Sequence, residues 1–282
     1  MLEFILSKGK AMLKTVIIDI TCINEGDSLK KFTENTGYFV TEKISKEFRG
    51  SADALLITDS REKANIGKMY GIGFALYINE YSHSSDFPDA LYCIESLFDL
   101  DDISLERIYL RTKNLPWTIF ETNRCIVREI TLDDIDDLYR IYSNPETKRY
   151  IEDLYPKKED EILFTKEYIA HQYRFFEYGM WVVIDKKSGK LIGRAGLSDR
   201  DGFDITEIGF LFDKSFWGMG YAFEICSGIL KYAKEKLYMD EMISFTMNEN
   251  ERAKKLLERL GFSHEGTRNI NSGTFLYYKK KL

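Results

Sequence analysis

Two glycines separated by one residue form a candidate binding element. The segment FWGMGYAFEI, residues 216–225, places Gly218 and Gly220 between an apolar stretch and a run that is typical of a helix. Glycine has no Cβ, so its backbone adopts positive φ easily and lets another molecule come close to its N–H groups. The first N–H groups of a helix have no partner within the helix, and they bind anions well. The segment therefore indicates either a site for a phosphate group or a tight strand-to-helix turn that binds nothing.

Two common phosphate-binding loops do not fit this segment. A P-loop carries a Lys directly after its last glycine, and no Lys follows Gly220 at that spacing. In the dinucleotide pattern GxGxxG a third glycine lets the helix pack on the sheet, but Phe223 occupies that place. Asp240, the acid at the expected distance, also precedes a predicted strand, whereas the ribose-binding acid should end one. Both loops are excluded.

The wider context resembles the GNAT family of N-acetyltransferases. The stretch TEIGFLFDKSFWGMGYAFEI, residues 206–225, is similar to the strand, loop and helix that bind acetyl-CoA in that family through a Q/R-x-x-G-x-G/A motif. Trp217, Gly220 and Ala222 take the places of that motif, and the form WGxGYA is similar to the ribosomal-protein N-terminal acetyltransferase branch. A second signature, NERAKKLLERLGF, puts Asn250 at the family's cofactor-contacting position. The resemblance covers residues 124–282.

This resemblance implies acetyl-CoA as co-substrate and implies a set of residues that bind it. The pyrophosphate would lie at the helix start, and backbone groups of the preceding strand would pair with the amides of the pantetheine arm. The implied cofactor-binding residues are Phe210, Phe212, Trp217, Gly218, Met219, Gly220, Tyr221, Ala222 and Asn250. No metal site is expected.

Acetyl transfer to an amine also needs acid and base catalysis. Most amines are protonated near neutral pH, so a base must remove a proton before the lone pair can attack the thioester. Glu207 stands where the resemblance places a carboxylate base for direct attack in a ternary complex. The acid for the leaving thiolate stays open, because Leu257 and Ala253 occupy the family's Tyr and Ser places. The remaining candidates are Tyr277, Tyr278 or water.

The apolar pattern predicts an α/β (α+β) chain. The resemblance implies that the domain at residues 119–282 has the GNAT acyl-CoA N-acyltransferase fold, with a mixed, mostly antiparallel sheet. The first predicted helix follows Thr131 and buries Ile135, Leu138, Tyr139 and Tyr142. The second spans residues 159–177 and buries Ile162, Ile169, Tyr173 and Phe176. Strands are predicted at 180–185, 190–198, 204–212 and 242–247, with a strand pair at the end of the chain, and further helices at 221–237 and 250–262.

Residues 1–118 predict a separate, smaller α/β lobe with a parallel sheet. Apolar strands at 14–20, 54–60 and 73–79 alternate with helical sequence. Residues 52–80 resemble the later half of haloacid-dehalogenase-type phosphatases, with Asp59 at the place of an acid that helps to hold magnesium in that family. The stretch KTVIIDITC is similar to the family's nucleophile strand, with Asp19 as the first Asp. The second Asp of that family's DxDxT motif is Thr21, which indicates a degenerate lobe used for substrate presentation or oligomerisation.

The amino-acid composition argues against several classes of binding partner. The 282 residues carry 40 basic and 46 acidic side chains, and this net charge of −6 argues against broad nucleic-acid binding. Four scattered cysteines and three isolated histidines indicate neither a disulfide framework nor a zinc site. The N-terminal sequence fits neither a signal peptide nor a membrane span, so we expect a cytoplasmic protein without a membrane partner. A homodimer is left open.

The acceptor is predicted only as a primary amine, either a small molecule or a protein N-terminus. The acids Asp133, Asp134, Asp136 and Asp137 would suit a cationic acceptor, although such a cluster is more often a solvated helix start. Two other functions remain: a bifunctional protein with a phosphatase-like N-terminal lobe, and a non-catalytic regulator that binds acetyl-CoA.

Overall fold

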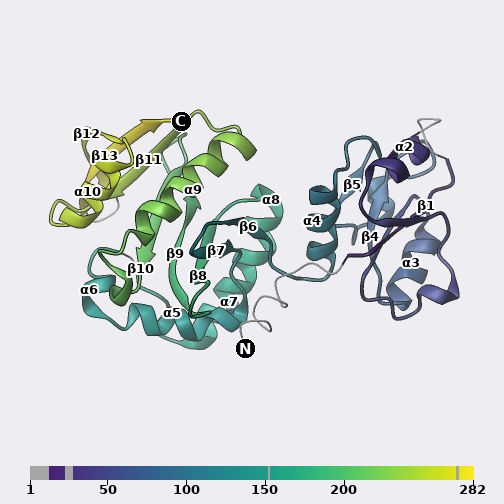
Figure 1. Ribbon diagram of the computed structural model, residues 1–282, viewed down its shortest axis with the longest axis horizontal. Helices are drawn as coiled ribbons and strands as arrows, with labels where there is room; N and C mark the ends of the chain where they lie inside the picture. Colours follow the sequence, from purple (N-terminus) through teal and green to yellow (C-terminus); the bar gives the residue numbers. More distant parts are fainter. Residues whose placement is uncertain (1–12, 23–27, 152, 271–272) are drawn as a thin grey trace. The chain divides into compact units, whose positions relative to one another are not determined.

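The computed structural model describes residues 13–22, 28–151, 153–270 and 273–282. The chain forms two compact units, the first ending at Trp117 and the second running from Thr118 to Leu282 (Figure 1). Within the described residues, no helix combines the length and the apolar character that crossing a membrane requires.

The first unit is built on a five-stranded parallel sheet in the order β2-β1-β3-β4-β5, which confirms the predicted parallel α/β lobe. Its central strands are apolar on both faces, and Ile17, Leu56 and Leu76 are fully buried. The elements are β1 (Thr15–Asp19), α2 (Ser28–Asn35), β2 (Phe39–Thr41), β3 (Ala54–Thr58), α3 (Arg61–Met69), β4 (Gly73–Tyr77), β5 (Cys93–Ile94) and α4 (Asp102–Thr112).

The second unit is built on an eight-stranded sheet in the order β12-β13-β11-β10-β9-β8-β7-β6. Its strands are β6 (Thr118–Glu121), β7 (Cys125–Arg128), β8 (Met180–Asp185), β9 (Leu191–Ser198), β10 (Glu207–Phe212), β11 (Glu241–Thr246), β12 (Ser263–Ile270) and β13 (Gly273–Lys281). Among the strands described, β10 and β11 are the one parallel pair and all other neighbours are antiparallel. The mixed, mostly antiparallel sheet is therefore confirmed.

The sheet opens between the two strands of the parallel pair, β10 and β11. A helix, α9 (Tyr221–Lys236), connects β10 to β11, as parallel neighbours require. In the described chain, the register of this pair consists of Glu207 opposite Ile243, and the Ser244 hydroxyl then donates to the Ile208 carbonyl at 3.0 Å. Beyond that point the two strands no longer pair. Their divergence leaves one edge of β10 without a neighbouring strand.

Helices cover both faces of the sheet. On one face α9 buries Ile225, Cys226 and Ile229, and Tyr232 meets Trp181 edge-to-face with ring centroids 5.7 Å apart. On the other face α5 (Ile135–Tyr142) contacts β9. The remaining helices are α6 (Pro145–Lys148), α7 (Lys158–Tyr168), α8 (Arg174–Phe176) and α10 (Glu251–Arg259).

Three local predictions are wrong. The single helix predicted at 159–177 consists of α7, a π-helical stretch at Ile169–Tyr173 and α8. The wider π turn rotates the following residues, so Phe176, which was predicted to be buried, is 47% exposed. On α5, Ile141 is buried where Tyr139 was predicted and Tyr139 is half-buried. The segment Thr118–Glu121, next to the predicted boundary between the two domains, is a strand that was not predicted from the sequence.

Candidate active site

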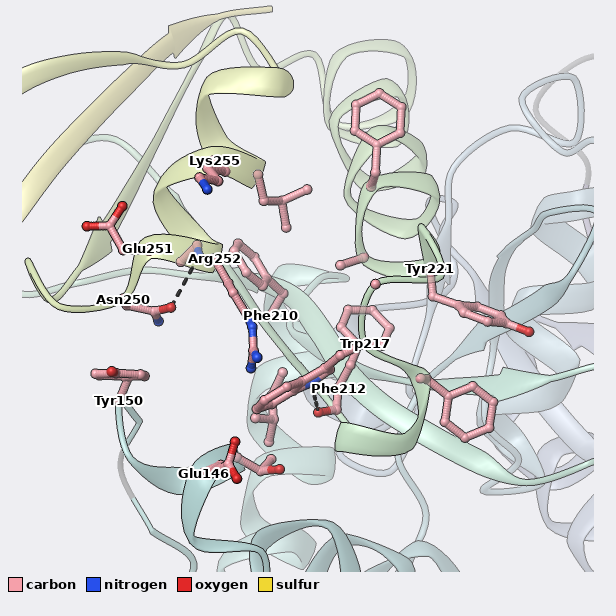
Figure 2. Close-up of a pocket in the computed structure, with 18 of the residues that line it drawn as sticks. Glu146, Tyr150, Phe210, Phe212, Trp217, Tyr221, Asn250, Glu251, Arg252 and Lys255 are labelled. Atoms are coloured by element: carbon pink, nitrogen blue, oxygen red, sulfur yellow. Dashed lines mark hydrogen bonds between the residues drawn. The ribbon is translucent and has the colours of Figure 1, made fainter.

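One cavity of about 670 Å³ lies in the second unit, where β10 diverges from β11 (Figure 2). Its walls come from β10, the loop that leads to α9, the first turn of α9, the α6 segment and α10. The lining includes Phe210, Phe212, Trp217, Gly218, Gly220, Tyr221, Ala222 and Asn250. Met219, the remaining residue predicted to bind cofactor, is absent from this lining.

The glycine loop has the backbone conformation that favours glycine. Gly218 and Gly220 have φ angles of 75° and 81°, in the left-handed region, and Gly220 is the N-cap of α9. Asp213 caps the preceding 3₁₀ turn, because its side chain accepts from the Ser215 N–H at 2.9 Å. The N–H groups of the first α9 turn are therefore presented at the cavity wall with no side chain at the two glycines. This arrangement suits a phosphate group.

Trp217 ties the loop to the strand before it. Its indole Nε1–H donates to the Phe212 carbonyl at 2.8 Å, and the Arg252 guanidinium lies 4.3 Å from the centre of its ring. The indole donor and the Phe212 carbonyl are thus used within the protein. Trp217 contributes a ring surface to the cavity, and the Phe212 carbonyl already accepts one hydrogen bond from it.

The backbone of Phe210 faces the gap between the diverging strands. The Asp213 N–H donates to Ile192 on β9 at 2.8 Å, so odd-numbered residues of β10 direct their backbone groups to β9. Even-numbered residues direct theirs toward β11. At Phe210 the two strands have already separated, and its N–H and C=O are available to an extended, amide-containing chain.

Met219 and Tyr221 belong to the outer side of the loop. Met219 is 60% exposed, and its carbonyl accepts from Arg124 Nη1 at 2.9 Å. The Tyr221 hydroxyl donates to Asp185 at 3.0 Å, and Arg124 covers its ring with the guanidinium carbon 4.0 Å from the centroid. Figure 2 shows this hydroxyl pointing away from the cavity. Tyr221 nevertheless lines the cavity and Met219 does not, and the assignment of both as cofactor-binding residues stays a prediction.

Asn250 begins α10. Its side-chain oxygen accepts from the Ala253 N–H at 3.2 Å, which makes it the N-cap of that helix. The side-chain Nδ2 is left as a donor in a residue that lines the cavity. The residue thus has a structural role that its place in a motif does not reveal.

The two roles of Asn250 can be separated by substitution. Asn250→Ala removes the cap and is expected to lower the free energy of unfolding by about 1 kcal/mol. Asn250→Asp keeps a capping oxygen but replaces the Nδ2 donor, so stability should stay near wild type while acetyl-CoA binding weakens. Chemical denaturation and calorimetry measure the two effects. An Asp variant that binds like wild type would restrict Asn250 to capping.

Glu207 lies outside the cavity lining, at the last paired residue of β10. It is 7% exposed, and its Oε2 accepts from Arg200 Nε at 2.6 Å. Because side chains alternate along a strand, Glu207 projects from the face of β10 opposite to Phe210. It therefore stands where the strands begin to diverge, with its carboxylate fixed by a cation.

Neither tyrosine considered as the thiolate acid lines the cavity. Tyr277 and Tyr278 are both buried on β13. Tyr277 packs against Phe245 with ring centroids 5.4 Å apart, and burial raises the pKa of Tyr278. The structure brings neither hydroxyl to the cavity wall, so the identity of this acid stays open.

Several lining residues were not identified from the sequence. On α10 they are Arg252, Lys255 and Arg259, and on the opposite wall they include Glu146 and Tyr150. The Tyr150 hydroxyl donates to the Glu249 carbonyl at 3.3 Å, and Glu146 forms an ion pair with Lys214. The three cations recur at intervals of three and four residues, which is a helical signal that was available in the sequence.

The acidic cluster after Thr131 is a helix start. Asp134 accepts from Arg128 Nη2 at 2.7 Å and from the Thr131 N–H at 2.7 Å. Asp136 pairs with Lys158, and Asp137 lies 3.1 Å from Arg140. Three of the four acids are therefore paired with residues of the protein itself, and no acceptor amine is needed to explain the cluster.

The acids of the first unit meet at the carboxyl ends of β1 and β3. Asp19 pairs with Lys63 and accepts from the Ile44 N–H at 3.0 Å. Asp59 accepts from the Thr21 N–H at 2.9 Å and from Asn79 at 2.8 Å. Within the described residues there is no cluster of three or more His, Cys, Asp or Glu that could hold a metal ion. A phosphatase-like role for this lobe stays a prediction.

The sheet opened by one parallel pair, together with a glycine-lined helix start, defines an acetyltransferase of the N-acetyltransferase fold. Residues 124–263 match the family model of the acetyltransferase (GNAT) domain, and this part of the chain is a GNAT domain. Enzymes of this family use acetyl-CoA. The predicted family, fold, enzyme class and co-substrate are confirmed.

Two relatives and one solved structure with similarity to this chain are also named as acetyltransferases. The uncharacterized N-acetyltransferase YoaA of Bacillus subtilis is 26% identical over 149 residues, which are 52% of this chain and 84% of YoaA. The [ribosomal protein uS5]-alanine N-acetyltransferase of Escherichia coli is 24% identical over 164 residues, 54% of this chain and 82% of that protein. The structure of RimL, a ribosomal L7/L12 alpha-N-protein acetyltransferase, is 12% identical and shares the fold with a TM-score of 0.52, covering 60% and 96% of the two chains.

Proposed function

We propose that the second unit transfers the acetyl group of acetyl-CoA to a primary amine by direct attack in a ternary complex, with Glu207 as the base. The observation that carries this proposal is the cavity at the divergence of β10 and β11, which ends at the glycine loop of α9. One wall offers backbone N–H groups to a diphosphate, and the other offers the free backbone groups of Phe210 to an amide-containing arm.

The chemistry follows from the position of Glu207 at the paired end of β10. A molecule that extends from the glycine loop along Phe210 brings its far end toward the point where the strands meet. Glu207 would there take a proton from the incoming ammonium group, directly or through a water molecule. The amine nitrogen then forms its bond to the acetyl carbon, the carbon–sulfur bond breaks, and the sulfur leaves as a thiolate that takes up a proton.

The acceptor is proposed only as a class. The E. coli relative carries an alanine of ribosomal protein uS5 in its name, and RimL is described as acting on ribosomal L7/L12. These names support a protein N-terminus as one option, and a small-molecule amine is the other.

Thiol release from acetyl-CoA, measured with the full chain, tests the function. A panel of diamines, aminoglycosides and short N-terminal peptides is presented with acetyl-CoA, and calorimetry measures acetyl-CoA binding separately. We expect micromolar-range binding and acceptor-dependent thiol release with at least one class. Absence of acetyl-CoA binding would contradict the proposal. Binding without turnover on any amine would instead support the non-catalytic regulator.

A further inference from the structure

Three cations follow one face of α10 and line the cavity. Arg252, Lys255 and Arg259 are spaced by three and four residues, so they form a stripe along the helix. None of the three forms an ion pair with a residue that the structure describes. Carboxylates neutralise many other cations of this unit, for example Arg124 by Glu224 and Arg200 by Glu207. The stripe is therefore a concentration of free positive charge in a cavity wall.

Aromatic rings hold the two arginines in place. The Arg252 guanidinium lies over Trp217, and the Arg259 guanidinium lies over Phe223 with its carbon 3.9 Å from the ring centroid. Both rings come from the wall that the glycine loop and α9 form. Trp217 belongs to the loop, and Phe223 belongs to the first turns of α9. A guanidinium stacked on a ring keeps its N–H edge free for an anion, and the stacking reduces the conformational freedom that binding would otherwise remove.

The two arginines serve different parts of the cavity. Arg252 contacts the ring beside Gly218, near the helix start that suits a diphosphate, as Figure 2 shows for Arg252 and Trp217. Its charge also reaches Glu146, whose pKa is lowered chiefly by a hydrogen bond from Lys214 and to a smaller extent by Arg252. Arg259 lies seven residues further along α10, about 10 Å by the helical rise. It is thus the cation at the end of the stripe away from Trp217.

Acetyl-CoA carries two separate anionic groups, the diphosphate and the 3′-phosphate on the ribose of its adenosine. We propose that Arg259, held by Phe223 and supported by Lys255, binds the 3′-phosphate and makes the enzyme select the complete coenzyme over its 3′-dephospho form. This inference rests on acetyl-CoA occupying the cavity, as proposed above. A row of free cations also disfavours a cationic amine in this part of the cavity, so the acceptor enters elsewhere.

Calorimetry with coenzyme A and dephospho-coenzyme A tests the assignment, because the two ligands differ only in the 3′-phosphate. The full chain is expected to bind coenzyme A about tenfold or more tightly than dephospho-coenzyme A, the range for a charge-assisted contact to phosphate. Arg259→Gln should weaken coenzyme A binding by about that factor and leave dephospho-coenzyme A unchanged. Arg252→Gln should weaken both ligands alike. The matched control is Lys231→Gln, which removes an exposed charge from α9 outside the cavity and should change neither affinity.

A second variant addresses the stacking. Phe223→Leu keeps an apolar side chain but removes the ring, and it should reduce the preference for coenzyme A while Arg259 is still present. An Arg259→Gln variant that loses affinity for both ligands equally would indicate a contact to the adenine and overturn the assignment. Unchanged affinity for both would also overturn it. Failure of the proposed function has a different signature, because neither ligand would then bind to the wild-type protein.

Discussion

Glu207→Gln is expected to lower the turnover number about 100- to 10,000-fold, the range for loss of a general base. The substituted side chain has nearly the same shape and can still accept a hydrogen bond from Arg200, but it cannot take up a proton. Glu207 is absent from the cavity lining, so the affinity for acetyl-CoA should change by less than about twofold, far below the effect of a lost hydrogen bond. Steady-state kinetics with a saturating acceptor, together with calorimetry, separates the two quantities.

A matched carboxylate controls for charge. Glu235→Gln removes one exposed negative charge from α9, at a residue that lies 3.9 Å from Lys231, and it should leave turnover unchanged. Thermal unfolding of both variants shows whether the fold is retained. If Glu207→Gln turned over like the wild type, Glu207 would have no part in proton transfer, and the base would have to be sought among other groups near the paired end of β10.

Gly220→Ala is expected to weaken acetyl-CoA binding about 10- to 100-fold, equivalent to losing one or two charge-assisted contacts. Gly220 has a φ of 81°, which costs a residue with a Cβ about 1–2 kcal/mol. A Cβ added here would meet nothing closer than Arg124 Nη2 at 3.7 Å, so the protein itself has room for it. The expected loss comes from the reoriented N–H groups of the first α9 turn and from the methyl group at the approach of the phosphate.

Gly202 is the matched control for backbone strain. It has a φ of 84°, and a Cβ added there would have no neighbour within 4 Å, but it lies in the turn between β9 and β10 and outside the cavity. Gly202→Ala should lose a similar amount of stability and keep its affinity for acetyl-CoA. Equal affinities for the Gly202→Ala and Gly220→Ala variants would show that the glycine loop does not bind the diphosphate.

The central elements of the second unit follow from local signals in the chain. Apolar segments bounded by turn-forming residues predicted β8 and β9, the helical period predicted α9, and Gly261 ends α10 with a φ of 84°. The spacing of Gly218 and Gly220 before a helix was compatible with a phosphate site or a plain turn, and the second motif at residues 250–262 favoured the phosphate site. These signals are local because turns, caps and periodic burial depend on residues a few positions apart.

The predicted helix at 159–177 contains a feature that local signals did not predict. The apolar pattern continues through residue 176, and it contains no sign that Ile169–Tyr173 adopts a π-helical turn. A single inserted residue in the turn changes which side chains face the sheet, so Tyr173 is fully buried and Phe176 is exposed. Packing against the sheet, rather than the apolar pattern of the sequence, decides which of these two side chains is buried.

The sequence by itself determined the family and the fold class and identified part of the cavity lining, because two motifs and the order of the elements can be recognised along one chain. The tertiary structure decided which contacts each of these side chains makes. The Trp217 indole N–H donates to the Phe212 carbonyl, Asn250 caps α10, and Met219 is exposed on the outer side of the loop. The stacking of Arg252 on Trp217 and of Arg259 on Phe223 joins residues more than 30 positions apart. Such contacts depend on how α9 and α10 pack in space, and no local pattern of residues encodes them.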